Sequence, residues 1–93
     1  MRKKREIKNE IRWTMPSLSV NEGMARAMVA AFCAQANPTS TEIADIKCAV
    51  SEAVTNCIVH AYPNSIGKIS MRVKILEDSV VSIAIRDWGC GIP

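Results

Sequence analysis

The sequence has few aromatic residues, a single histidine and no long apolar run. The 93-residue chain contains only two Trp, one Tyr and one Phe, which form no aromatic platform of the kind that stacks on nucleic-acid bases. Its apolar stretches fall short of the roughly 18–20 residues that a membrane-spanning helix needs. One histidine and four cysteines without a Cys-x-x-Cys pair lack the ligand spacing of a zinc site. The composition therefore argues against a zinc module and against a membrane-spanning protein.

The cysteines and the N-terminus both bear on the compartment. Cys33, Cys48, Cys57 and Cys90 lie in apolar or glycine-rich surroundings, which is typical of small buried thiols in a reducing compartment. The basic N-terminus leads into Ile7-Lys8-Asn9-Glu10 in place of an apolar segment, so no secretory signal peptide is expected. We therefore expect a cytoplasmic protein.

Positive charge is concentrated at the N-terminus. Residues 1–12 carry six basic and two acidic side chains, whereas the rest of the chain carries six and seven. We interpret residues 1–8 as a basic extension and residues 9–93 as one domain, since a chain of this length holds one modest core. No basic face recurs later in the sequence, so direct nucleic-acid binding is not predicted.

Three segments have the alternating pattern of strands. Ile11–Met15 alternates apolar and polar residues up to Pro16. Residues 69–75 and 81–85 alternate in the same way on either side of a short turn at residues 77–79, which predicts an antiparallel hairpin.

Two segments have helical spacing, and each begins with a capping box. The boxes are at residues 19–22 and 39–42, and the first helix should run to about Ala36, before Asn37-Pro38. Arg26 should project away from the core. The predicted core stripes are Met24, Met28, Ala31 and Phe32 in the first helix, and Ile43, Ile46, Val50, Ala53, Val54 and Cys57 in the second. The order of elements predicts an α+β, two-layer sandwich with both helices on one face of an antiparallel or mixed sheet.

Two polar motifs stand out from this framework. Glu52 and Asn56 lie one turn apart on the second helix, facing away from the apolar stripe. An amide oxygen is a suitable magnesium ligand, and a carboxylate can accept a proton from a nucleophile that attacks a γ-phosphate. Asp87 ends the last strand and precedes Gly89 and Gly91, where backbone can approach a ligand closely and the carboxylate can accept a hydrogen bond from an adenine amino group.

Together the motifs resemble the anti-sigma factor serine kinases of the GHKL ATPase superfamily. The similarity runs from about Asn9 to Ile92 and corresponds to the N-terminal two-thirds of those proteins. It is carried by Asn21-Glu22, Ala25-Arg26, Ser51–Asn56, His60, Tyr62, Ile85–Asp87, Gly89 and Gly91.

The resemblance implies ATP and Mg²⁺ as cofactors and assigns roles to the polar residues. Glu52 would be the general base for a serine hydroxyl, Asn56 a magnesium ligand and Asp87 the adenine acceptor, with Gly89 and Gly91 shaping the pocket. Members of the family phosphorylate an anti-anti-sigma protein and sequester a sigma factor, here a sporulation sigma factor, in most cases as homodimers.

The family continues beyond this point with a nucleotide lid and a second glycine motif, so we expect a C-terminally truncated domain. Such a chain should offer adenine and magnesium contacts, but its own triphosphate binding should be weak or absent, and its last strand should be an unpaired edge. Two alternatives stay open. One is a non-catalytic module that binds a sigma factor, with Arg26 as a contact to an acidic partner surface. The other is a fragment of the catalytic domain of a histidine sensor kinase.

Overall fold

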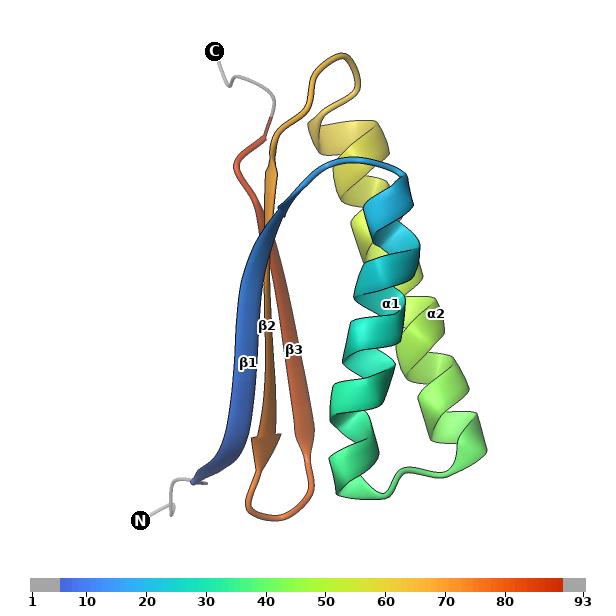
Figure 1. Ribbon diagram of the computed structural model, residues 1–93, viewed down its shortest axis with the longest axis vertical. Helices are drawn as coiled ribbons and strands as arrows, with labels where there is room; N and C mark the ends of the chain where they lie inside the picture. The colour runs from blue at the N-terminus through green and yellow to red at the C-terminus, as the bar shows by residue number, and fades with distance from the viewer. Residues whose placement is uncertain (1–5, 90–93) are drawn as a thin grey trace.

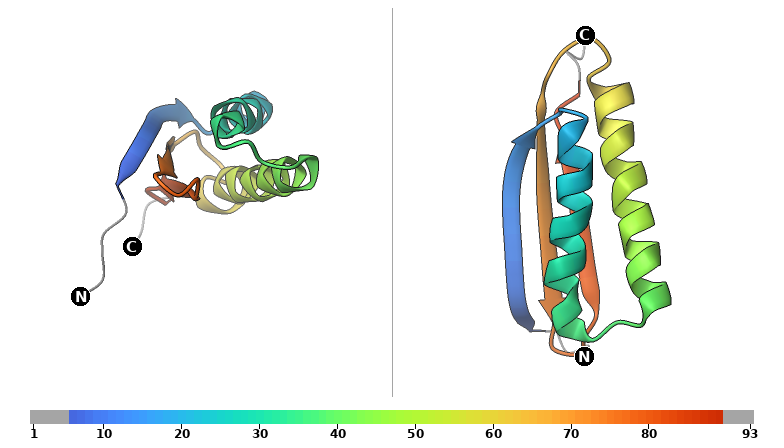
Figure 2. Two further views of the ribbon diagram at one scale, coloured as in Figure 1. Left: turned by 90° about the horizontal axis from the view of Figure 1, so that it is seen from below. Right: turned by 45° about the vertical axis from the view of Figure 1, so that its right-hand side comes forward.

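The computed structural model describes residues 6–89, which form a three-stranded sheet covered on one face by two helices (Figure 1). The elements follow the order β1 (Ile7–Pro16), α1 (Val20–Cys33), a 3₁₀ turn η1 (Ala34–Ala36), α2 (Ser40–Asn56), a π-helical turn η2 (Cys57–Ala61), β2 (Lys68–Leu76) and β3 (Val81–Asp87). This is the predicted α+β architecture, with both helices on the same side of the sheet (Figure 2). Within residues 6–89, neither helix is long and apolar enough to cross a bilayer.

The sheet has the order β1-β2-β3 and is antiparallel throughout. Ile11 pairs with Val73 and Val73 with Ile83, so these three residues lie on the face toward the helices. The predicted hairpin is confirmed, with its turn between Leu76 and Val81. Among the described residues β3 has only β2 as a neighbour, which agrees with the expected edge strand.

The core lies between the sheet and the helices. Its largest fully buried side chains are Ile69, Met71, Val73, Val29, Val50, Val54 and Cys33. The predicted stripe of the second helix is confirmed at Val50, Val54 and Cys57. The alternation predicted for residues 69–75 is also confirmed, because every second residue of β2 is buried.

The predicted core stripe of the first helix is confirmed only at Phe32, which packs against the core. Helix α1 buries Ala25, Val29 and Cys33, whereas Met24 is 42% exposed. Those three residues are spaced four apart and are small, so α1 can pack closely against the bulky side chains of the sheet. The larger Met and Phe side chains lie at the edges of this contact.

The two predicted capping boxes have different outcomes. Thr39 and Glu42 form a complete box, in which the Thr39 hydroxyl accepts from the Glu42 N–H at 3.0 Å and the Glu42 carboxylate accepts from the Thr39 N–H at 2.8 Å. Ser19 forms none, because its backbone is already helical and its side chain makes no capping bond. The Glu22 carboxylate binds Arg26 and Ser51 instead.

The open face of the sheet is basic, which the linear sequence did not indicate. Strand alternation puts Arg12 opposite Arg72, and Arg72 opposite Ala84, on the side away from the helices. Among the strand residues with a printed pairing, one carboxylate, Glu10, shares this face with the cations Arg12, Lys68, Arg72, Lys74 and Arg86. Glu10 accepts from Arg72 at 2.9 Å and lies 3.3 Å from Arg12. The premise that no basic face recurs after the N-terminus is therefore wrong.

Candidate nucleotide site

Asp87 is held at the end of β3 by two hydrogen bonds. It pairs with Ile69 in the sheet, so its side chain lies on the helix-facing side. One carboxylate oxygen, Oδ2, accepts from the Cys57 thiol with an Sγ–O distance of 3.4 Å. The other, Oδ1, accepts from the Gly89 N–H at 3.0 Å. The carboxylate is thus fixed between the end of β3 and the end of α2.

Cys57 is the residue through which the helix reaches Asp87. It follows Asn56 directly, begins the π-helical turn and is only 7% exposed. The pKa of the Cys57 thiol is raised from 9.0 to about 11. Burial is the largest cause, and the hydrogen bond to Asp87 and the negative charge of that carboxylate add to it. The thiol is therefore protonated at neutral pH and available as a donor.

The Cys57–Asp87 contact brings the two predicted polar motifs together. Glu52 and Asn56 lie on the last turns of α2 and are exposed, as the helical spacing predicted. Within residues 6–89, neither side chain has a hydrogen-bond or ion-pair partner. Both can therefore bind a ligand without first breaking an internal contact.

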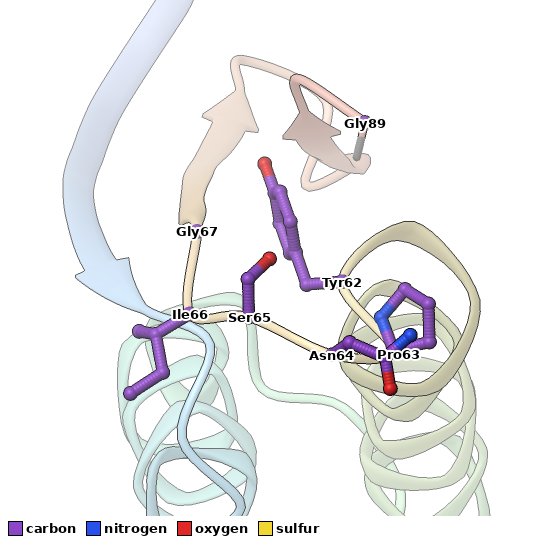
Figure 3. Close-up of a pocket in the computed structure, with 7 residues that line it drawn as sticks. All are labelled: Tyr62, Pro63, Asn64, Ser65, Ile66, Gly67 and Gly89. Atoms are coloured by element: carbon purple, nitrogen blue, oxygen red, sulfur yellow. The ribbon is translucent and has the colours of Figure 1, made fainter. Parts of the chain in front are cut away.

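A pocket of about 480 Å³ lies next to Gly89, the residue whose N–H binds the Asp87 carboxylate. It is lined by the loop of residues 62–67 and by Gly89 (Figure 3). Gly89 has a φ of 73°, a left-handed conformation that favours glycine. Gly91, the other predicted pocket residue, lies outside the described residues.

Tyr62 connects the loop of this pocket to the sheet. Its hydroxyl donates to the Lys68 carbonyl and accepts from the Trp88 N–H, both at 2.8 Å. In Figure 3 its side chain extends from the loop toward the strand ends. The loop is also tied to the end of β1, because Ser17 N–H donates to the Gly67 carbonyl and Gly67 N–H donates to the Ser17 hydroxyl, each at 2.9 Å.

Trp88 forms the solvent-exposed rim next to Gly89. It is 45% exposed, and the Lys68 ammonium and the Arg86 guanidinium lie 4.8 and 4.9 Å from its ring centroid. Both distances are within the range of cation–π attraction. The sequence pattern predicted Cys57 as a core residue and Tyr62 as part of a motif, and it gave no role to Trp88. The apolar or aromatic character of these residues gave no sign of their polar contacts.

Arg26 lies on the exposed side of α1, but it is paired. Its guanidinium donates to Glu22 at 3.0 Å, and the same Glu22 oxygen accepts from the Ser51 hydroxyl at 2.8 Å. With 41% of its side chain exposed, Arg26 retains surface for a partner. The network joins α1 to α2 at the residue before Glu52.

Comparison with known proteins identifies the family. Residues 15–93 match the model of the histidine kinase-like ATPase domain. The chain belongs to the histidine kinase-like ATPase family. This confirms the predicted GHKL resemblance, and it agrees with the sheet and helices described above.

The curated relatives are anti-sigma F factors. The chain is 55% identical over 87 residues to the anti-sigma F factor of Caldanaerobacter subterraneus subsp. tengcongensis, and 50% identical over 88 residues to that of Bacillus licheniformis. It is 49% identical over 90 residues to that of Geobacillus stearothermophilus. Each match covers 94% of this chain and 60% of the relative. The chain therefore spans about three-fifths of the length of these anti-sigma F factors.

Proposed function

We propose that this chain supplies the adenine- and magnesium-binding part of an ATP site in an anti-sigma factor that phosphorylates a serine of an anti-anti-sigma protein. The observation that carries the proposal is the Cys57–Asp87 hydrogen bond, because it brings the end of β3 to the end of α2, next to Asn56. Family membership and the similarity to anti-sigma F factors support the same function.

In this site Asp87 is the adenine acceptor. The amino group of adenine donates to a carboxylate held in place by two backbone or side-chain donors, and each carboxylate oxygen has a further lone pair. Gly89 forms part of the adjacent pocket wall. An adenine ring has a π-face that can lie in the pocket beside Tyr62.

Asn56 and Glu52 act on the phosphate side. Within residues 6–89 no group of three or more His, Cys, Asp or Glu side chains could hold a metal. That is compatible with Mg²⁺ held by the Asn56 amide oxygen together with the nucleotide phosphates, since magnesium in such sites takes few protein ligands. When bound, the ion offsets the charge of the phosphates. Glu52, free of internal partners, accepts the proton of the attacking serine hydroxyl.

The similarity to anti-sigma F factors supports a proposal for the protein partners. We infer that the chain binds a sporulation sigma factor in the cytoplasm and that it forms a homodimer. Arg26 contributes a cation to the sigma-factor surface, held in orientation by Glu22. A non-catalytic sigma-binding module is the second candidate, with the part-exposed Arg26 as its contact.

Nucleotide binding and mutagenesis test the proposed function. ATP binding should depend on magnesium, both in this chain and in a version extended to the length of the anti-sigma F relatives. Asp87→Asn should weaken ATP binding at least tenfold. Asp45 is an exposed acidic residue elsewhere on α2, and Asp45→Asn should leave ATP binding unchanged. Equal affinity of Asp87→Asn and the parent would contradict the adenine assignment.

Kinase assays separate catalysis from binding. In the extended version, Glu52→Gln should abolish serine phosphorylation and retain nucleotide binding. Retained phosphorylation would exclude Glu52 as the base. Co-precipitation with the sigma factor should fall for Arg26→Ala and not for the exposed Lys47→Ala, which is the matched control. Sigma binding without any phosphorylation would favour the non-catalytic module.

A further inference from the structure

We propose that Cys57 is a positioning residue whose thiol holds Asp87 in the orientation that accepts the amino group of adenine. This inference rests on the proposed function, because it assigns the means by which that site selects its base. It concerns a side chain to which the proposed function gives no part in base recognition.

The geometry leaves Asp87 little freedom. A carboxylate on a strand end can rotate about its last side-chain bond, but here each oxygen has a different donor. The Gly89 N–H, two residues after Asp87, donates to Oδ1. The Cys57 thiol, at the end of α2 and 30 positions earlier in the sequence, donates to Oδ2. Loss of either donor would release the carboxylate to rotate away from the base. Because Gly89 donates through its backbone, Cys57 is the donor that a substitution can remove.

A thiol suits this position because it combines two properties. It packs in the apolar core, where Cys57 lies with Val54 and Tyr62. It also carries a proton that it can donate to a carboxylate. A larger polar group would have to bury additional unpaired atoms, and an alanine would fill most of the space without donating.

The same protein contains a matched control. Cys33 is a second buried free thiol, on α1, and is fully buried. Burial raises its pKa as it does that of Cys57. Unlike Cys57, it makes no bond to Asp87. Cys33→Ala therefore removes the same atoms from the core without touching the carboxylate.

The experiment compares ATP with ITP, each with magnesium, by NMR titration of the 93-residue chain. ITP has a carbonyl oxygen at position 6 in place of the amino group, so it cannot make the amino-to-Asp87 hydrogen bond. Cys57→Ala should weaken ATP binding about three- to tenfold, the effect of one lost hydrogen bond, and leave ITP binding unchanged. Cys57→Ser retains a donor and should restore most of the ATP affinity. Cys33→Ala should change neither affinity.

The outcomes distinguish this inference from the function on which it rests. An equal loss of ATP and ITP affinity in Cys57→Ala, or no rescue by Cys57→Ser, would overturn the positioning role and leave a packing role. An unchanged ATP affinity in Cys57→Ala, with a loss in Asp87→Asn, would overturn it alone. If neither the parent chain nor the version extended to the length of the anti-sigma F relatives binds ATP or ITP, the proposed function is overturned, and the inference with it. Circular dichroism of each variant establishes that it is folded.

Discussion

The hydroxyl of Tyr62 accepts a hydrogen bond from the backbone N–H of Trp88, 26 positions later, at 2.8 Å. The same hydroxyl donates to the Lys68 carbonyl, so one buried phenol joins the loop after α2 to the ends of both β2 and β3. The walls of the pocket are therefore fixed relative to one another by a single side chain. The shape of the pocket should depend on this contact more than on any other in the loop.

Removal of the hydroxyl should loosen the pocket. Tyr62→Phe keeps the ring in the core but leaves the Trp88 N–H and the Lys68 carbonyl without this partner. The free energy of unfolding should fall by about 1–3 kcal/mol, as measured by urea denaturation. Trp88 lies at the contact, so its fluorescence emission should also change. An unfolding free energy equal to that of the parent would show that water replaces the hydroxyl at no cost.

Gly67 should tolerate no side chain. A Cβ atom at this position would overlap the Tyr62 ring, and that ring cannot move without breaking both hydroxyl bonds. Gly67→Ala should therefore destabilise the protein by about 1–3 kcal/mol. Gly23→Ala is the control, because a Cβ there meets only the end of the Arg26 side chain, at 3.8 Å. It should be neutral or stabilising, since alanine is the better helix former. Thermal denaturation of both variants tests this prediction.

The two predicted capping boxes provide a matched pair. Thr39→Ala should lower the free energy of unfolding by about 1 kcal/mol, because a complete box is lost. Ser19→Ala should change it by less than about 0.5 kcal/mol, because the Ser19 side chain makes no capping bond. Chemical denaturation of the two variants gives both values. Equal losses would mean that Ser19 caps α1 in solution.

Stability should decline in mildly alkaline solution because of Cys57. Its folded pKa, about 11, is above its ordinary value of 9.0. The contribution of the protonated thiol to stability is complete below about pH 9, and it is lost as the pH rises towards 11, because the unfolded chain ionises first. In this range the free energy of unfolding can fall by up to about 1.4 kcal/mol per pH unit.

Cys57→Ala should flatten this dependence between pH 9 and 11. Part of the slope should remain, since burial also raises the pKa of Cys33. Urea denaturation at a series of pH values measures both curves. The same slope in Cys57→Ala and in the parent would assign the alkaline loss of stability to other groups.

The features that local pattern controls could be predicted from the sequence. The alternation in β2 and the stripe of α2 each depend on residues within one element, and both predictions were confirmed. The stripe of α1 was confirmed only at Phe32, because two adjacent faces of that helix are apolar and tertiary packing selected the one with smaller side chains. The sequence pattern contained no information on that choice.

The contacts within the candidate site were beyond sequence reasoning. Cys57 meets Asp87 only because the π-helical turn and the register of β3 bring the two together. The Tyr62 bonds depend in the same way on where the loop returns to the sheet. The residue types of Glu52, Asn56, Asp87 and Gly89 led to the prediction of a nucleotide site, which stays a prediction. Cys57 and Tyr62, whose contacts hold Asp87 and the loop, resembled ordinary core residues.

The basic open face of the sheet also gives the part of the chain that the structure describes an electric dipole. The helices on the other side carry four acidic and two basic side chains, so the negative end of the charge distribution lies on the helical layer. A charged partner that approaches in solution would be rotated by this dipole before contact. Basic surfaces would be steered toward the helices and polyanions toward the sheet. The association rates of both should fall as added salt shortens the reach of the field.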